Sequence, residues 1–239
     1  MEKKEISIVI PAYNEEKRIG NSLKKILSYL KKNKFNFEII VVDDGSTDNT
    51  IKIVKKINSN IRIIKNNSNK GKGFSVRKGI LSANKQLILF SDADLSTPIE
   101  ELPRLIKAIE DDYDLAIGSR AITGAKIEIH QPFYREAIGR IFNKIVQTIA
   151  TWGIKDTQCG FKLFKKKTAK EIFSRLTINN FGFDVEAIFI AKKKGYKIKE
   201  IPITWINSAG SKVSPVKDSI KMFLDLFKIR IYSLLGKYK

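Results

Sequence analysis

The first half of the chain alternates between short runs that are apolar throughout and longer stretches with helical spacing. Five apolar runs predict strands, at residues 6–10, 37–42, 61–64, 86–90 and 115–118. Stretches of helical spacing lie between them, at residues 15–30, 46–57, 71–83 and 99–111. A strand with no polar alternation is buried on both faces, as in a parallel sheet covered by helices. We therefore expect an α/β fold with a mostly parallel sheet flanked by helices.

The second half is less regular, but its apolar spacing still predicts several elements. We expect helices at residues 135–152 and 183–194, strands at 160–164 and 198–201, and a last helix at 216–232. A length of 239 residues suits one large domain with at most a small appendage. The predicted organisation is one domain over residues 1–214, followed by an amphipathic helical segment over residues 215–239.

Polar clusters follow three of the predicted strands at the point where each strand ends. They are Tyr13-Asn14-Glu15, Asp43-Asp44-Gly45 and Asp92-Ala93-Asp94. Ligands of open α/β sheets bind beyond the carboxyl ends of the strands. Three acidic clusters at one edge of a sheet are hard to explain as solvated loops, so we expect a ligand site there.

Asp92 and Asp94 have the chemistry of a site for a hard cation. In an extended segment, one carboxylate could ligate the ion directly while the other acts through water or on a ribose. Oxygen ligands suit Mg²⁺ or Mn²⁺, which also bind the oxygens of a diphosphate. Such an ion would neutralise a leaving nucleoside diphosphate. Short acidic pairs also occur by chance, and the alternative is that they cap the helix predicted after Thr97-Pro98.

The other polar positions allow a structural and a binding interpretation. Asp43 and Asp44 could accept hydrogen bonds from a nucleobase or a ribose, or could simply form the turn that follows. Lys72 lies in Lys70-Gly71-Lys72-Gly73, at the start of a predicted helix. This segment lacks the pattern of a P-loop or a dinucleotide fingerprint. A helix start with a lysine can still contribute to binding a phosphate charge.

The charge balance allows three interpretations. With 45 basic and 25 acidic residues, the formal net charge is +20. Nucleic-acid binding is one explanation, attraction to an anionic membrane or a phosphorylated substrate is another, and genome composition is the third. The single cysteine, Cys159, excludes an intrachain disulfide and fits a cytoplasmic setting. We expect no signal peptide and no membrane span at the N-terminus, where too few apolar residues precede Pro11.

The combined motifs resemble the inverting GT-A glycosyltransferases that use nucleotide sugars. The residues that carry this resemblance are Pro11-Ala12-Tyr13-Asn14-Glu15, Val42-Asp43-Asp44-Gly45-Ser46-Thr47-Asp48 and Asp92-Ala93-Asp94. In the second half, the segments similar to the dolichyl-phosphate glucosyltransferase group are Gly118-Ser119-Arg120, residues 156–164, Phe183-Asp184-Val185-Glu186 and Gly210-Ser211-Lys212-Val213. Dolichyl-phosphate mannose synthases are close relatives, and Asp94-Leu95-Ser96-Thr97-Pro98 is more similar to the glucosyl group.

The resemblance implies a role for individual residues. Those implied to bind the nucleotide sugar are Pro11, Tyr13, Glu15, Asp43, Asp44, Lys72 and Asp92. Asp92 and Asp94 are implied to hold the metal. Arg120, Arg135 and Lys212 are implied to meet the acceptor phosphate. Asp156 and Gln158 fall near the reacting sugar, and together with Arg120 and Arg135 they form the implied catalytic set.

The implied reaction moves a hexose, by preference glucose from UDP-glucose, onto dolichyl or polyprenyl phosphate with inversion and with Mg²⁺ or Mn²⁺. The acceptor phosphate is ionised near neutral pH, so positioning and charge neutralisation would matter more than a strong base. Asp156 is the candidate base if one exists, and a structural role is the alternative. Transfer of mannose from GDP-mannose is a second hypothesis. A nucleic-acid-binding module is a third, which the acidic rim disfavours, so we expect no nucleic-acid partner.

The last predicted helix bears on the location of the protein. Basic residues flank an aromatic and aliphatic face, as in a helix that lies in a membrane interface, although it could equally pack on the domain. Eukaryotic members of the glucosyl group typically carry an N-terminal anchor, whereas this chain begins at its first predicted strand. We therefore expect peripheral attachment, at the cytoplasmic face of the cell membrane.

Overall fold

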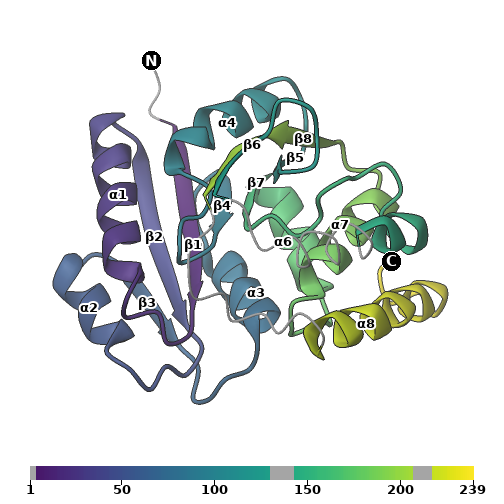
Figure 1. Ribbon diagram of the computed structural model, residues 1–239, viewed down its shortest axis with the longest axis horizontal. Helices are drawn as coiled ribbons and strands as arrows, with labels where there is room; N and C mark the ends of the chain where they lie inside the picture. Colours follow the sequence, from purple (N-terminus) through teal and green to yellow (C-terminus); the bar gives the residue numbers. More distant parts are fainter. Residues whose placement is uncertain (1–3, 130–142, 207–216) are drawn as a thin grey trace.

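The computed structural model describes residues 4–129, 143–206 and 217–239 (Figure 1). A seven-stranded sheet in the order β3-β2-β1-β4-β7-β5-β8 forms its centre. The strands, in that order, are Arg62–Lys65, Asn36–Asp43, Glu5–Ala12, Leu87–Ser91, Phe161–Lys165, Leu115–Ser119 and Ile198–Pro202. All strand pairs are parallel except those of β7, which runs antiparallel to both β4 and β5. The predicted α/β fold with a mostly parallel sheet is confirmed.

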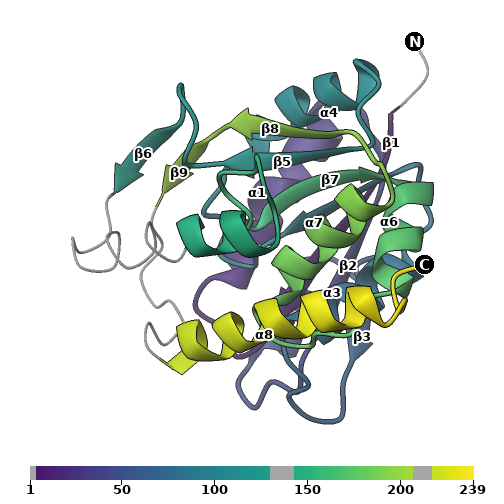
Figure 2. The ribbon, with the colours of Figure 1, turned by 90° about the vertical axis from the view of Figure 1, so that its right-hand side faces the viewer.

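Helices cover both faces of the sheet (Figures 1 and 2). One face packs against α1 (Ile19–Lys32), α2 (Thr50–Ile57), the short helix η1 (Ile99–Glu101) and α4 (Leu102–Glu110). The other face packs against α3 (Lys72–Ser82), α6 (Lys166–Ser174) and α7 (Phe183–Lys193). The last helix, α8 (Lys217–Leu234), lies against the outer side of α7.

The central strands are apolar throughout because each one supplies side chains to two cores. In β1, Ile6, Ile8 and Ile10 face the core under α1 and α4, whereas Val9 faces the core under α3 and α7. All four side chains are fully buried. This two-sided burial is the physical reason that a continuous apolar run predicted a covered parallel strand.

Two boundaries at the end of β1 differ from the sequence prediction. The strand continues through Pro11 to Ala12, because β1 pairs with β4 only as far as Val9 and keeps β2 alone beside it beyond that point. A proline lacks an amide hydrogen, so it is tolerated where the strand has only one neighbour. The next helix begins at Ile19 instead of residue 15, since residues 16–18 form a turn closed by the carbonyl of Glu15.

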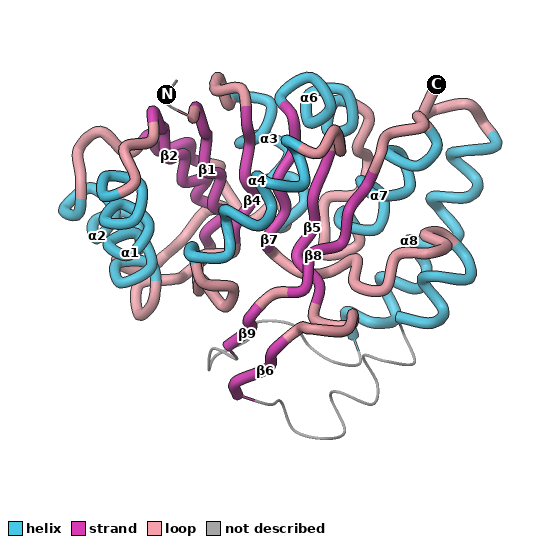
Figure 3. Tube along the Cα trace, turned by 90° about the horizontal axis from the view of Figure 1, so that it is seen from above, coloured by secondary structure: helices cyan, strands magenta, loops and turns pink. Residues whose placement is uncertain are grey.

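In the second half, the strands and helices predicted near 160–164, 183–194, 198–201 and 216–232 are all present within a few residues. Residues 143–149 are helical, as predicted for 135–152, and the earlier part of that segment lies outside the described residues. The sequence prediction missed α6 and a small parallel pair, β6 (Lys126–Ile129) with β9 (Thr204–Ile206), seen beside the main sheet in Figure 3.

Candidate functional site

Parallel pairing brings the three acidic clusters to one edge of the sheet. β1 is parallel to β2 on one side and to β4 on the other, with Ala12 beside Asp43 and Val9 beside Phe90. The segments that follow these strands therefore leave the sheet at the same rim. The predicted arrangement of the three clusters at one edge is confirmed, and the roles of their residues stay predictions.

The segments after β1 and β2 are joined to each other by hydrogen bonds. The Asn14 amide donates to Ser46 Oγ at 2.9 Å, and the Thr47 amide donates to Asn14 Oδ1 at 2.8 Å. The Glu15 amide donates to Thr50 Oγ1 at 2.7 Å, and the Glu15 carboxylate pairs with Arg18 at 2.8 Å. Tyr13 is half-buried in the same segment, and Pro11 is buried at the end of β1. The segments after β1 and β2 therefore form one hydrogen-bonded surface at this side of the rim.

Asp43 and Asp44 differ in what they contact. Asp43 accepts from the Ser46 amide at 3.2 Å, in the manner of an Asx turn. Asp44 is buried and accepts from the amides of Lys70 and Gly71 at 2.9 and 2.8 Å, and from Asn66 Nδ2 at 2.8 Å. Asp44 thus fixes the loop that leads into α3, and any contact of either residue with a nucleotide stays a prediction.

Asp92 and Asp94 lie in a turn at the end of β4 and not in an extended segment. The Leu95 amide donates to the Asp92 carbonyl at 3.2 Å, and Leu95 has a φ of +50°. Both aspartates are half-buried while Ala93 and Leu95 are buried, so the two carboxylates share the accessible side of the turn. The following short helix starts only at Ile99, without a side-chain cap. The alternative that these acids cap a helix is therefore wrong.

Lys72, the first residue of α3, reaches the acidic turn. Its ammonium lies 2.7 Å from Asp92 Oδ1 and 5.4 and 5.8 Å from the ring centroids of Phe90 and Phe181. Burial lowers the pKa of Lys72, but the charges of Asp92 and Asp184 outweigh burial and raise it, so the side chain is cationic. On the other side of the turn, Arg18 Nη1 lies 3.6 Å from Asp94 Oδ2.

Gly160, just before β7, packs directly against Asp92. The Asp92 amide donates to the Gly160 carbonyl at 3.0 Å. A Cβ atom added to Gly160 would lie 2.0 Å from Asp92 Oδ2, which no real contact allows. One side of the Asp92 carboxylate is thus packed against backbone, and the other carries the Lys72 ammonium.

A buried ion pair lies beneath this site. Lys162 on β7 donates to Asp184 Oδ1 at 2.5 Å and to the Cys159 carbonyl at 2.6 Å, and both charged side chains are almost fully buried. Burial raises the pKa of Asp184 by more than the charge of Lys162 lowers it. The Lys162 ammonium also lies 5.5 Å from the Phe90 ring centroid, so Phe90 is flanked by two ammonium groups.

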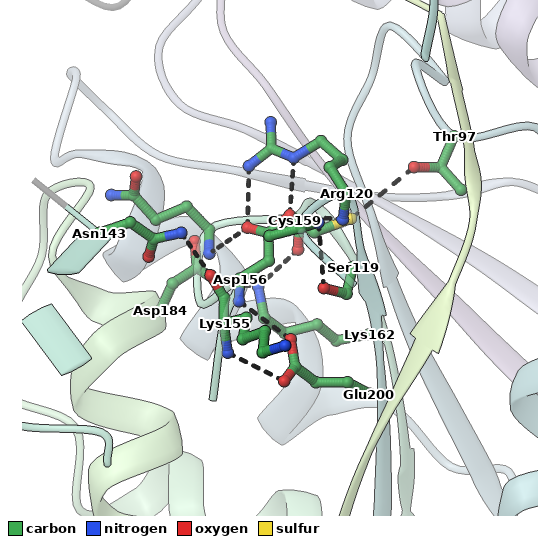
Figure 4. A network of polar contacts seen from close by, with 12 residues as sticks. Thr97, Ser119, Arg120, Asn143, Lys155, Asp156, Cys159, Lys162, Asp184 and Glu200 are labelled. Atoms are coloured by element: carbon green, nitrogen blue, oxygen red, sulfur yellow. Dashed lines mark hydrogen bonds and ion pairs between the residues drawn. The ribbon is translucent and has the colours of Figure 1, made fainter. Parts of the chain in front are cut away.

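Arg120 and Asp156 form a second ion pair beyond β5 (Figure 4). Arg120 Nε and Nη2 donate to the two carboxylate oxygens at 2.7 and 2.9 Å, and the Arg120 amide adds a bond at 2.9 Å. Glu200 on β8 accepts from the Lys155 and Asp156 amides, at 2.9 Å each, and so fixes the backbone under the pair. The guanidinium carbon lies 5.4 Å from the Trp205 ring centroid.

The electrostatics of the neighbouring residues follow from this pair. Burial raises the pKa of Asp156, but the charge and hydrogen bonds of Arg120 outweigh burial and hold it below its usual value. Burial raises the pKa of Cys159 to about 11, so the thiol stays protonated and unreactive, in keeping with a packing role. Gln158 is half-buried and its side-chain amide contacts Met222 Sδ of α8 at 3.6 Å.

The acidic turn fits a divalent cation that has further ligands from a substrate. Asp92 and Asp94 offer hard carboxylate oxygens and are partly accessible, and each attracts a cationic side chain. Within residues 4–129, 143–206 and 217–239, no group of three or more His, Cys, Asp or Glu residues could hold a metal ion. Mg²⁺ typically binds one or two carboxylates together with substrate phosphates, and the turn supplies the carboxylates of such a set.

Two of the predicted site residues, Arg135 and Lys212, lie outside the described residues. The structure adds three residues that sequence reasoning did not single out for a role, namely Arg18, Gly160 and Lys162. A lysine within the apolar run Phe161-Lys162-Leu163-Phe164 was a usable signal, since a two-sided buried strand has no solvent-facing position for it. Arg18 and Gly160 carry no comparable signal, because their importance comes from contacts distant in sequence.

Comparison with known proteins agrees with this architecture. Residues 7–173 match Glycosyl transferase family 2. The chain is 41% identical to a dolichyl-phosphate beta-glucosyltransferase of Saccharomyces cerevisiae, over 98% of this chain and 76% of that protein. It is 38% identical to the Dictyostelium discoideum protein of the same name, with the same two coverages, and 36% identical to the human one, over 99% and 78%.

Solved structures show the same fold at low sequence identity. A mannosyl-3-phosphoglycerate synthase from Rubrobacter xylanophilus superposes with a TM-score of 0.71 at 15% identity, over 98% of this chain and 75% of that one. A Mycobacterium tuberculosis glucosyl-3-phosphoglycerate synthase in complex with Mn²⁺, UDP-glucose and phosphoglyceric acid gives 0.68 at 16% identity, over 95% and 79%.

The chain belongs to glycosyltransferase family 2, and within it to the group of dolichyl-phosphate beta-glucosyltransferases. It is a glycosyltransferase with the GT-A fold.

Proposed function

We propose that the enzyme transfers glucose from UDP-glucose to dolichyl or polyprenyl phosphate with inversion, which yields a lipid-linked sugar donor for glycan or glycoprotein synthesis. The relatives are named dolichyl-phosphate beta-glucosyltransferases, which supports the sugar and the lipid phosphate of this proposal. The observation that carries the proposal is that one sheet edge holds both an accessible acidic pair, Asp92 and Asp94, and a fixed guanidinium, Arg120. These two features suit a metal-bound diphosphate and an anionic acceptor respectively.

On the donor side, the nucleoside would contact the segments after β1 and β2 through Pro11, Tyr13, Glu15 and Asp43. Asp92 and Asp94 would hold Mg²⁺ or Mn²⁺, which would supply positive charge to the leaving diphosphate. The structurally similar glucosyl-3-phosphoglycerate synthase was crystallised with Mn²⁺ and UDP-glucose, which supports a divalent ion of this kind. Asp44 would act by fixing the loop before Lys72.

On the acceptor side, Asp156 would orient Arg120 for the lipid phosphate. Its contacts use Nε and Nη2 of the guanidinium, and 30% of the Arg120 side chain is exposed for an acceptor. The lowered pKa of Asp156 makes it a weak base, but an ionised phosphate needs little proton removal. Arg135, Lys212 and Gln158 would complete this side.

Measuring transfer to polyprenyl phosphate from UDP-glucose, UDP-GlcNAc and GDP-mannose, with and without Mn²⁺, tests the proposal. We expect UDP-glucose and Mn²⁺ to give the product, and Asp94→Ala to abolish transfer with the melting temperature unchanged. A preference for GDP-mannose would instead assign the protein to mannosyl transfer. Near-normal transfer by Asp94→Ala would remove the metal role of that residue.

We further propose that α8 rests on the membrane that carries the lipid acceptor. One face of α8 packs on the domain through Met222, Leu226 and Ile229. The opposite face exposes a row of apolar side chains, among which Ile220, Leu224 and Ile231 are more than half exposed. The sequence left open whether this helix packs on the domain or contacts a membrane. One face does pack on the domain, and the opposite face is exposed for a membrane contact. The predicted division at residue 214 falls within 207–216, outside the described residues.

Charge favours an anionic lipid surface as the occupant of this apolar face. Lys221 and Arg230 are exposed on α8, and Lys228 and Lys237 lie over the Tyr232 ring beside it. The chain as a whole carries a formal net charge of +20. Among the described residues, no helix is long and apolar enough to cross a membrane. An interfacial helix of this type binds through buried apolar area together with attraction to anionic lipids. The cytoplasmic face of the cell membrane is the proposed location.

Co-sedimentation with vesicles that contain anionic lipid tests this surface. We expect Leu224→Ser with Phe227→Ser to weaken vesicle binding by about tenfold or more, because two exposed apolar side chains are lost. Leu81→Ser, which changes an exposed leucine on α3, is the matched control and should bind as the wild type does. Unchanged binding of the double variant would exclude α8 as the membrane contact.

A further inference from the structure

Both oxygens of the Asp92 carboxylate have a close neighbour in the structure. Asp92 Oδ1 lies 2.7 Å from the Lys72 ammonium, and Oδ2 packs so closely against Gly160 that a Cβ there would clash at 2.0 Å. Oδ2 is thus hindered by the backbone of Gly160, and Oδ1 is the oxygen that already has a cationic partner. For Asp92 to ligate a divalent cation, two positive charges would compete for the same oxygen, and their mutual repulsion is large at such distances.

Lys72 has other favourable contacts if it leaves Asp92. Its ammonium lies over the rings of Phe90 and Phe181, and the charge of Asp184 acts on it in addition to that of Asp92. Asp44 fixes the preceding residues through the Lys70 and Gly71 amides. Gly71 itself has a φ of +101° and packs against the Asn179 carbonyl. The start of α3 is thus held in place, so that a movement of Lys72 is confined to its side chain.

We infer that Lys72 is an exchangeable counter-ion of Asp92. The Lys72 ammonium pairs with the Asp92 carboxylate before the donor binds. It must leave Asp92 Oδ1 when that oxygen ligates the divalent cation. The released ammonium then pairs with the diphosphate of the donor, which arrives with the cation. Lys72 is in this sense a positioning residue for Asp92 and a binding residue for the donor in turn. This inference rests on the proposed function for the metal role of Asp92 and for the identity of the donor.

The affinity for Mn²⁺ in the absence of any nucleotide tests the exchange, measured from the electron paramagnetic resonance signal of free Mn²⁺. We expect Lys72→Met to bind Mn²⁺ about tenfold more tightly than the wild type, because the competing ammonium is gone while the apolar stem is kept. Lys72→Arg retains the charge and should stay within about twofold of the wild type. If Lys72→Met does not fold, Lys72→Gln serves the same purpose.

Two controls assign the gain to the Lys72–Asp92 contact. Lys107→Met removes the same ammonium from a surface pair, Lys107–Asp111, with the same distance of 2.7 Å, and should leave Mn²⁺ affinity unchanged. In an Asp92→Asn background, Lys72→Met should give no gain, because the oxygen under competition is no longer charged. Weaker or equal Mn²⁺ binding by Lys72→Met, or no measurable binding by either protein, overturns the inference.

The second half of the exchange is tested with UDP in the presence of saturating Mn²⁺. We expect Lys72→Met to weaken UDP binding by about tenfold, since the ammonium that pairs with the diphosphate is missing. Unchanged UDP affinity would overturn the inference that the Lys72 ammonium pairs with the diphosphate of the donor. Neither measurement involves glucose or a lipid, so a failure to form glucosyl lipid would reject the proposed function and leave this inference standing.

Discussion

Two aspartates at the same edge of the sheet are held in opposite ways. Asp156 is buried, with both of its oxygens bonded to one guanidinium at 2.7 and 2.9 Å and a backbone amide in addition. Asp92 is one-third exposed and meets Lys72 through a single contact. A bidentate arginine pair in a dry setting is fixed in geometry, whereas a lysine is a compact charge on a flexible stem.

The difference corresponds to the two tasks that we propose for this rim. A group that must keep an arginine in position benefits from a rigid, fully bonded partner. A group that must accept a cation during each reaction benefits from a partner that can leave. The antiparallel strand β7 lies between β4 and β5 and provides Lys162, and Gly160 just before this strand packs against Asp92. The predictions that follow test whether one pair is fixed and the other exchangeable.

The largest effect on stability is expected at the fixed pair. Asp156→Asn keeps the size of the side chain but leaves Arg120 without its counter-charge. Because removal of one member of a largely buried pair is costly, we expect the free energy of unfolding to fall by about 3 kcal/mol. Urea denaturation of wild type and variant measures this. A loss below about 1 kcal/mol would show that the Arg120–Asp156 pair is not structurally fixed.

Gly160→Ala should displace Asp92 without removing any charge. The added Cβ would clash with Asp92 Oδ2, so the carboxylate or the backbone has to shift. We expect kcat for sugar transfer to fall about 100-fold, the usual penalty for misplacing a group by about 1 Å. Transfer assays with Mn²⁺ measure this, and an unchanged melting temperature shows that folding is intact. Wild-type kcat would mean that the position of Asp92 is not critical.

The fixed pair should also show in the response of stability to acid. The pKa of Asp156 is lowered in the folded protein, so its contribution is fully present above the ordinary aspartate pKa of about 4 and is lost as pH falls through the lowered value. The stability difference between wild type and Asp156→Asn should therefore narrow below pH 4, by at most about 1.4 kcal/mol per pH unit. Urea denaturation at several pH values measures it. A constant difference would contradict the assigned ionisation.

The smallest effect is expected when the exchangeable pair is removed. Lys72→Met should change the free energy of unfolding by less than about 1 kcal/mol, because a partly exposed single-contact pair contributes little and methionine keeps the apolar stem on the rings. The same urea experiment compares it with Asp156→Asn. A loss as large as that of Asp156→Asn would mean that Lys72 is a structural element and not an exchangeable one.

Sequence patterns were sufficient for the first half of the fold and for the composition of the rim. Continuous apolar runs identified the parallel strands, and the acidic clusters after β1, β2 and β4 could be placed at one edge because parallel strands end there. The less regular second half was only partly predictable. The segments that became α6, β6 and β9 give weak or short periodic signals, and nothing local specifies that β7 runs antiparallel.

The sequence by itself determined which acidic clusters follow the buried strands, since an apolar run and the polar residues after it are local features. Only the tertiary structure decided how those side chains are paired. Arg120 and Asp156 are 36 positions apart, and Lys72 and Gly160 approach Asp92 from opposite sides of it in the sequence. Such contacts depend on strand order and on the course of loops, which are properties of the whole chain. Whether a carboxylate has a fixed or an exchangeable partner depends on which residue pairs with it, and the fold brings that residue to it.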